Sequence, residues 1–271
     1  MPKRLPNDQA LYTGSLSRRE VLGLLSVAGT AVLTGGRPPR TETTAEGAGL
    51  LATHHSPVGC VVTPSQTEGP YFIDEKLERS DIRVDPSDGT TREGTPLRLR
   101  FAVARVDGNA CTPVTGAFVD IWQCDALGVY SGVKDFQGLF DTTGRKFLRG
   151  HQVTNRRGTA DFLTIYPGWY AGRSVHIHFK VRVFEGARRA HEFTSQLYFH
   201  ESVTDVVHGV PPYNTKGRRD TLNERDGIYR REKGAQLLLP VKKDGNGYAG
   251  DFAIGLRTHP MRPDRDGDRR G

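Results

Sequence analysis

The sequence SVHIHFKVRV at residues 174–183 decides the fold class, because its side chains alternate strictly between apolar and polar. In a β-strand, residues i and i+2 lie on the same face. The apolar face consists of Val175, Ile177, Phe179, Val181 and Val183. The pattern predicts that this face packs against a core. His176 and His178 then lie on the opposite face, beside Lys180 and Arg182, which indicates that they are not core histidines.

Strand patterns recur on both sides of this stretch, which itself predicts a strand over 174–184. Four further strands are predicted at residues 97–103, 117–124, 161–165 and 193–199. Clusters of Gly, Pro, Asn and Asp separate them at short intervals, which is typical of an all-β sandwich. The polar segment 201–231 contains two consecutive prolines and is predicted to be a long loop that covers part of the domain.

The chain has 271 residues, 36% hydrophobic and 25% charged, which is an ordinary globular balance. Its net charge of +7 is concentrated at the N-terminus, where residues 1–40 contain six basic and two acidic side chains. No block of five Lys or Arg residues follows, so the charge does not indicate a nucleic-acid partner. No apolar run is long enough for a membrane-spanning helix, and stable membrane insertion is not expected.

The N-terminal segment has the features of an export signal. Arg18 and Arg19 precede an uncharged stretch at residues 21–33, which is too short to span a bilayer. The arginine pair, with Ser17 before it, resembles a twin-arginine signal; a Sec signal or an accidental basic pair is the alternative. We therefore expect export to the periplasm, cell envelope or exterior through the twin-arginine machinery.

Composition divides the chain into four parts. We expect a signal peptide at 1–40, a linker at 41–55, a β-sandwich domain at 56–257 and a disordered tail at 258–271. The three cysteines, Cys60, Cys111 and Cys124, form no C-x-x-C pair, so a zinc–thiolate site is not indicated. Outside the cytoplasm two of them could form a disulfide, and the sequence does not say which two.

The two histidines could bind one metal ion or lie on a solvated strand face, and the H-x-H pattern alone does not decide. Two tyrosines lie in turns before the histidine strand: Tyr170 shortly before it, after a Pro–Gly turn, and Tyr130 further back, between glycines. Each alone is typical of a surface anchor or a core filler. Together they suggest a ligand set of two phenols and two imidazoles. A phenol has a pKa of about 10, so only a strongly Lewis-acidic ion such as Fe(III) would deprotonate it at neutral pH.

Four longer motifs carry a family resemblance. They are TPSQTEGPY at 63–71, VDIWQCDALGVYSG at 119–132, FLRGHQVT at 147–154 and TIYPGWY at 164–170, which leads to Arg173 and the H-x-H pair. Together they resemble the intradiol ring-cleavage dioxygenases, the group of catechol, hydroxyquinol and protocatechuate dioxygenases, and most of all their exported single-domain bacterial branch. Gln123 departs from this branch, which usually has His there, but it is not a ligand position.

The resemblance implies a transthyretin-like β-sandwich with long active-site loops and one mononuclear non-haem Fe(III) per chain. The implied iron ligands are Tyr130, Tyr170, His176 and His178. Tyr166 is the alternative candidate for the ligand assigned to Tyr170, but Tyr170 stands at the family's ligand position.

The resemblance also implies roles around the iron. Tyr170 would act as ligand and base in turn, and Arg173 would be the active-site arginine, accompanied by Gln196. Gly69, Pro70 and Tyr71 would line the substrate mouth. The implied reaction uses O2 to cleave a small aromatic diol between its two hydroxylated carbons, giving cis,cis-muconate-type products.

Two other functions remain open from the residues. A zinc hydrolase on a β-sandwich would need a third His or a carboxylate ligand and a general base. An inactive transthyretin-like binding module would need no ligand set. The sequence does not identify the preferred diol or the oligomeric state.

Overall fold

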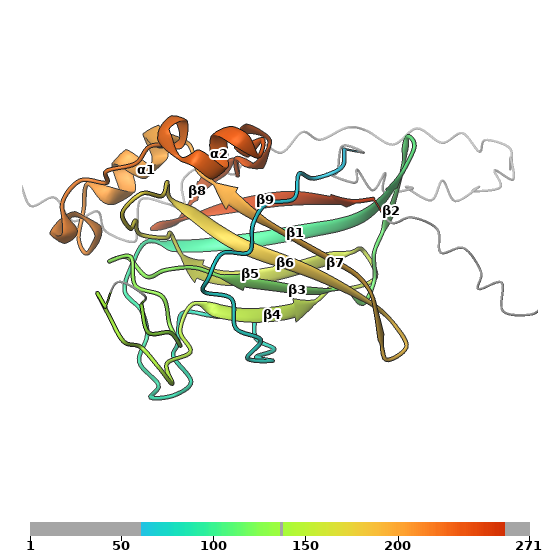
Figure 1. Cartoon of the computed structure of the whole chain (residues 1–271), viewed down its shortest axis with the longest axis horizontal. Helices are drawn as coiled ribbons and strands as arrows, with labels where there is room; N and C mark the ends of the chain where they lie inside the picture. Colours follow the sequence, from blue (N-terminus) through green and yellow to red (C-terminus); the bar gives the residue numbers. More distant parts are fainter. Residues whose placement is uncertain (1–60, 136–137, 258–271) are drawn as a thin grey trace, which may run out of the picture. The chain divides into compact units, whose positions relative to one another are not determined.

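Strand β1 (Pro96–Asp107) is the centre of the first sheet in the computed structural model, which describes residues 61–135 and 138–257. One edge of β1 pairs antiparallel with β5 (Thr159–Ile165) and β2 (Ala110–Pro113) (Figure 1). The other edge pairs parallel with β9 (Gly247–Leu256), which in turn pairs antiparallel with β8 (Val241–Asp244).

The second sheet has four antiparallel strands in the order β4-β3-β6-β7. They are β3 (Phe118–Trp122), β4 (Arg149–Val153), β6 (His176–Glu185) and β7 (Arg188–Tyr198). Strand β6 is internal, because it pairs with β3 on one side and β7 on the other. The strand that carries both histidines is therefore held on both edges.

The core lies between the two sheets. From β1, Leu97, Leu99 and Phe101 are essentially unexposed, and so are Ile177 and Phe179 of β6. The Phe101 ring, from the first sheet, lies 5.4 Å from the Phe179 ring of the second, centroid to centroid. The apolar face predicted for residues 174–183 is thus the face that packs in the sandwich, and the all-β prediction is confirmed.

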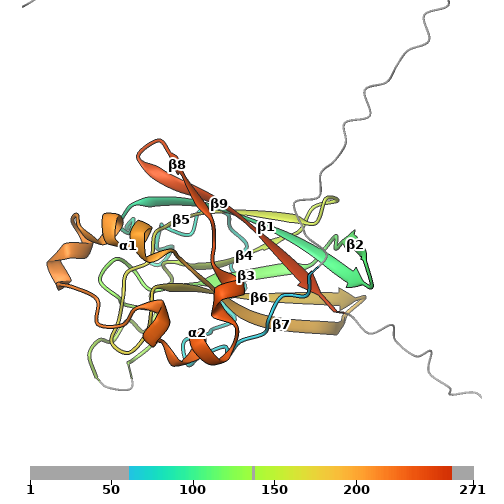
Figure 2. The same cartoon turned by 90° about the horizontal axis from the view of Figure 1, so that it is seen from above.

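The segment predicted as a long loop contains short helices. They are α1 (Glu201–His208), η1 (Tyr213–Lys216), η2 (Asn223–Arg225), α2 (Gly227–Arg231) and, just beyond it, η3 (Gly234–Leu237). Both views place α1 and α2 beside the same end of the sandwich (Figures 1 and 2). We call residues 201–231 the covering segment.

Five predicted strands correspond to β1, β3, β5, β6 and β7, whereas β2, β4, β8 and β9 were not predicted. Cys111 is disulfide-bonded, and Cys124 is free and buried. Cys60, the signal (1–40), the linker (41–55) and the tail (258–271) lie outside the described residues, so the predictions for these segments stay predictions. In 61–135 and 138–257, no helix is long and apolar enough to cross a membrane.

Candidate active site

The outer face of β6 is buried, although one interpretation of the sequence left it solvated. His176 and His178 are each 2% exposed, and they lie on the face opposite Ile177 and Phe179. Period-two alternation determines which residues share a face, but it does not determine what covers that face. Here the loops that carry Tyr71, Tyr130 and Tyr170 lie against the histidines, so the solvated-face alternative was wrong.

Four donor atoms converge above this face. His176 Nε2 lies 3.1 Å from His178 Nε2, 3.2 Å from Tyr170 Oη and 3.5 Å from Tyr130 Oη. A four-coordinate ion with ligand distances of about 2.0–2.1 Å would space its ligand atoms by about 3.3–3.4 Å. The observed spacing fits a set that shares one metal ion.

The geometry brings Tyr170 into this set and leaves Tyr166 out. Tyr166 is 0% exposed and belongs to the main core, where its ring lies 4.3 Å from the Phe199 ring. Its hydroxyl is hydrogen-bonded to Thr204 Oγ1 of α1 at 2.7 Å. The turn that separates the two tyrosines therefore points Tyr166 inward and Tyr170 towards His176.

Glycine allows the two tyrosine loops to meet. Gly128 has a φ of +83°, a conformation that L side chains rarely adopt, and a Cβ there would collide with the carbonyl oxygen of Trp169. Lys216 of the covering segment donates hydrogen bonds to Leu127 O at 2.7 Å and to Trp169 O at 2.8 Å. The loops before Tyr130 and Tyr170 are thus in direct contact and share one cation.

The histidine rings are oriented by their surroundings. His176 Nδ1 donates to the carbonyl oxygen of Ser174 at 2.6 Å, which leaves the Nε2 lone pair free to face the other donors. The His178 ring stacks on the Trp122 indole, with centroids 4.9 Å apart and planes 7° apart. Contacts of this kind, from groups that do not bind the metal themselves, fix the tautomer and direction of metal-binding imidazoles.

Burial sets the charge of all four donors. It lowers the pKa of His176 and of His178 well below the ordinary value, so both rings are neutral. Burial also raises the pKa of Tyr130 well above its ordinary value and the pKa of Tyr170 to about 12. Two neutral imidazoles and two phenols that ionise only beside a strong Lewis acid suit Fe(III).

The donor set does not fit a zinc hydrolase. Within residues 61–135 and 138–257, no group of three or more His, Cys, Asp or Glu side chains is placed to bind a metal. The two histidines therefore need the tyrosines to complete a ligand set. A hydrolytic zinc site would instead use a third imidazole or a carboxylate.

Arg173 and Gln196 lie together, as the resemblance implied. The Arg173 guanidinium donates to Gln196 Oε1 at 2.6 Å and, through Nε, to Asp226 Oδ2 at 2.9 Å. The side chain of Arg173 is only 16% exposed, so it is not a surface arginine, although it is paired with a carboxylate. Tyr198 also donates to Gln196 Oε1, at 3.2 Å, so Gln196 accepts from both sides.

The predicted mouth segment lies directly against the donors. Gly69 has a φ of +72°, and a Cβ there would lie 3.3 Å from His178 Cε1. The Tyr71 ring stacks on Tyr130 at 4.6 Å, and its hydroxyl donates to Asp135 Oδ1 at 2.7 Å. Buried Arg149 donates to Tyr71 O and thereby joins this segment to β4.

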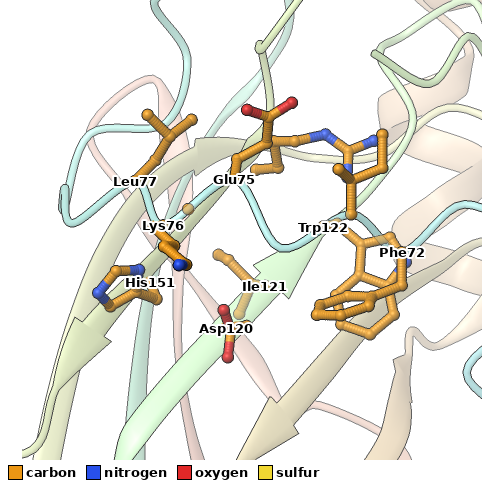
Figure 3. Close-up of a pocket in the computed structure, with 11 residues that line it drawn as sticks. Phe72, Glu75, Lys76, Leu77, Asp120, Ile121, Trp122 and His151 are labelled. Atoms are coloured by element: carbon orange, nitrogen blue, oxygen red, sulfur yellow. The ribbon is translucent and has the colours of Figure 1, made fainter. Parts of the chain in front are cut away.

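A small hollow is lined by Trp122 but not by His178. Figure 3 shows Phe72 beside the indole, and their rings are 4.9 Å apart. Asp120, Ile121 and His151 line the hollow as well. None of the four donors lines it, so it is separate from the ligand set.

Two contacts of the covering segment were not predicted from the sequence. Asp226 is 0% exposed and pairs with Arg173, and Lys216 joins the tyrosine loops. The only local signal at Asp226 is that of a helix N-cap, which says nothing about a partner some fifty residues earlier. Lys216 has no local signal, because its acceptors are main-chain carbonyls.

Comparison with known proteins gives a consistent result. The family model described as Dioxygenase matches residues 67–207. The chain is 29% identical over 161 residues to a chlorocatechol 1,2-dioxygenase of Pseudomonas sp., covering 54% of this chain and 60% of that protein. It is 27% identical over 246 residues to a 6-chlorohydroxyquinol 1,2-dioxygenase of Cupriavidus pinatubonensis, covering 82% of this chain and 76% of that protein. The chain thus spans less than two thirds of the chlorocatechol enzyme.

A solved structure extends the similarity over nearly a whole relative. The intradiol ring-cleavage dioxygenase from Tetranychus urticae is 32% identical, with a TM-score of 0.63. The alignment covers 75% of this chain and 98% of that one. The family-model match includes the segments with Tyr130, Tyr170, His176 and His178.

Proposed function

Because the chain belongs to the intradiol ring-cleavage dioxygenase family, we propose that it is a non-haem Fe(III) dioxygenase that cleaves catechol-type diols between their two hydroxylated carbons. Both atoms of O2 enter the product, a cis,cis-muconate-type diacid, so the reaction needs no external reductant. The observation that carries the proposal is the convergence of two phenol oxygens and the His178 Nε2 atom on His176 Nε2, at 3.1–3.5 Å from it.

Tyr130, Tyr170, His176 and His178 would bind one iron per chain. When bound, Fe(III) supplies the Lewis acidity that favours the doubly deprotonated diol and its reaction with O2. Of the two phenols, Tyr130 is 1% exposed, whereas Tyr170 is only partly buried and is the nearer in sequence to Arg173. We assign to Tyr170 Oη the role of accepting a proton from the substrate.

Arg173 supplies positive charge beside the donor set. Burial would lower its pKa, but Tyr170 and Asp226 act in the opposite direction and the net pKa is raised, so the guanidinium stays charged. A fixed cation of this kind stabilises negative charge that develops on a bound ring. Gln196 and Asp226 hold two of its nitrogens, and Gly69, Pro70 and Tyr71 border the substrate mouth.

The metal and its ligands can be tested together. We expect one Fe per chain and a red-brown protein whose visible band shifts when catechol is added without oxygen. Tyr170→Phe removes the phenol oxygen and keeps the ring, so it should alter the band and lower turnover by more than about a hundredfold. This loss exceeds the roughly 10–100-fold that is typical when a hydrogen-bond partner of a metal ligand is removed. Tyr166→Phe, the matched control, should leave both near wild type.

Two results would contradict this proposal. If Tyr166→Phe changed the band and Tyr170→Phe did not, the ligand assignment would move by four residues. Stoichiometric zinc in a colourless, active protein would mean that the protein is a zinc hydrolase and not a dioxygenase.

The substrate class needs a direct screen. We propose aromatic diols, and oxygen uptake with catechol, hydroxyquinol, protocatechuate and caffeate would rank them. Iron-loaded protein that consumes no oxygen with any of these diols would favour a binding module instead.

We also propose that the protein is exported through the twin-arginine machinery, on the basis of Arg18 and Arg19 before the uncharged stretch at 21–33. The double substitution Arg18→Lys and Arg19→Lys keeps the charge but removes the arginine pair. It should leave precursor in the cytoplasm, whereas unchanged export would favour the Sec route.

A further inference from the structure

Asp226 connects the covering segment to the start of the histidine strand. The residue is 0% exposed and follows η2 directly, as the N-cap of α2. It lies 52 residues beyond Ser174 in sequence, yet its carboxylate accepts hydrogen bonds from that residue. A carboxylate buried this completely needs partners for both oxygens.

The two oxygens of Asp226 face different parts of the molecule. Oδ1 accepts from the main-chain N–H groups of Ile228 at 2.7 Å and Tyr229 at 3.1 Å, which is an ordinary helix cap. Oδ2 accepts from Arg173 Nε at 2.9 Å, Ser174 N at 2.9 Å and Ser174 Oγ at 3.0 Å. Capping α2 uses only the first oxygen.

The contacts of Oδ2 lead to two functional side chains. The Arg173 guanidinium is held between Asp226 on Nε and Gln196 on its terminal nitrogen, so both its position and its plane are fixed. Ser174 O in turn accepts the Nδ1 proton of His176 at 2.6 Å, which directs Nε2 to the donor set. The Ser174 main chain is thus held at its N–H by Asp226 and bonded at its carbonyl to His176.

We propose that Asp226 is a positioning residue that fixes both the Arg173 guanidinium and, through the Ser174 main chain, the His176 imidazole. The proposal rests on the proposed function, because the importance of both groups depends on the iron-dependent reaction. It assigns the covering segment a role in the candidate site. It also separates two effects, since Arg173 acts on turnover whereas His176 acts on metal retention.

The test is Asp226→Asn in the full-length, iron-loaded protein. An asparagine can still cap α2 through its carbonyl oxygen, but its NH2 group then faces Arg173 Nε and the Ser174 N–H, donor against donor. We expect kcat to fall by about 10–100-fold with little change in KM. We also expect iron to be lost to a ferric chelator about tenfold faster, because removing a residue that orients a metal ligand commonly weakens metal binding by that order. We also expect the visible band to shift.

Asp120→Asn is the matched control. Asp120 is also a buried carboxylate bonded to an arginine, Arg182, at 2.8 and 3.0 Å, but neither residue contacts a donor. Its kcat, band and iron-release rate should stay within about twofold of wild type, although its unfolding midpoint should fall. Asp226→Ser provides a second variant if the asparagine protein does not fold, because serine caps helices equally well and is too short to reach Arg173.

A double-mutant cycle with Arg173→Ala distinguishes positioning from general destabilisation. If Asp226 acts on turnover through Arg173, adding Asp226→Asn to Arg173→Ala should lower kcat little further, while the faster iron release should persist. The proposal would be overturned if the kcat losses of Asp226→Asn and Arg173→Ala were fully additive. It would also be overturned if Asp226→Asn and Asp226→Ser both kept the wild-type kcat and iron-release rate. Wild-type protein that binds no iron would instead overturn the proposed function, and this would be evident before any variant is made.

Discussion

The outer face of β6 has two halves that look alike in sequence and differ in chemistry. His176 and His178 occupy one half, and Lys180 and Arg182 occupy the other, all within one alternating run. All four side chains are buried, with residue exposures of 2%, 2%, 4% and 9%. Burial alone therefore does not distinguish the functional half from the structural half.

Their partners distinguish them. Lys180 is paired with Glu68 and Glu192 and lies 3.8 Å from the centre of the Phe72 ring. Arg182 is paired with Asp120 and Asp74.

The histidines have no carboxylate partner in the part of the chain that the structure describes. Their Nε2 atoms face each other, and His176 Nε2 also faces two phenol oxygens. A charge with a local counter-ion needs no further partner, whereas uncharged donors that converge without a counter-ion indicate a candidate ligand site.

The largest effect is expected in the histidine half. His178→Leu keeps a similar volume beside Trp122 but removes the donor nitrogen, so the protein should bind no iron, lack the visible band and lose more than about a hundredfold in turnover. Metal analysis and oxygen uptake measure this. Its unfolding midpoint should stay near that of metal-free wild type. Equal iron content in the variant would mean that the two halves do not differ in function.

The other half should show the opposite pattern. Arg182→Met leaves the buried Asp120 carboxylate without its arginine, and breaking a buried pair in this way costs about 3–5 kcal/mol in the free energy of unfolding. Urea denaturation measures the loss, and iron content and band should match wild type. Adding Asp120→Leu should recover much of the stability, because it removes the uncompensated charge. Loss of iron in Arg182→Met would make this half part of the site.

Arg173 tests whether a paired cation can nevertheless be functional. It differs from Arg182 because its guanidinium is shared between Asp226 and an uncharged amide next to the donors. Arg173→Ala should keep iron and the catechol-induced band shift but lose about 2.7–4 kcal/mol of transition-state stabilisation, roughly a hundred- to a thousandfold in rate. Arg173→Lys should recover part of the rate, since a point charge does not reproduce the planar fork. Wild-type turnover in the alanine variant would place Arg173 with the structural pairs.

Alternation predicted the strands that supply the core, but not the remaining strands. β9 was missed because Gly247, Gly250 and Gly255 interrupt its apolar pattern. Gly255 is required by packing, because a Cβ there would collide with the carbonyl oxygen of Val61. Such a requirement arises from a neighbour in the fold and leaves no local pattern.

The residues of the candidate site also include some that the sequence predicted and some that it did not. The prediction of the donors, Arg173 and Gln196 came from matching motif positions, each of which lies within one continuous stretch of sequence. Asp226 and Lys216 belong to the covering segment, and their partners lie about fifty or more residues away. Contacts of that range depend on how the covering segment packs, which propensity does not determine.

The smallest effect is expected at Lys216, a cation whose acceptors differ from those of Lys180. Its Nζ donates to Leu127 O and Trp169 O, so it joins the loops of Tyr130 and Tyr170 instead of neutralising a carboxylate. Lys216→Met should cost about 1 kcal/mol, the net value of an ordinary hydrogen bond, because the side chain is exposed. Looser tyrosine loops should release iron to a chelator several-fold faster, with the visible band broadened and kcat nearly unchanged.

Lys242→Met, at an exposed position of β8, is the control and should match wild type in iron release, visible band and kcat. If Lys216→Met and Lys242→Met released iron equally slowly, the contacts of Gly128 alone would hold the two loops together. Lys216 would then have only a structural role, like Lys180 and Arg182.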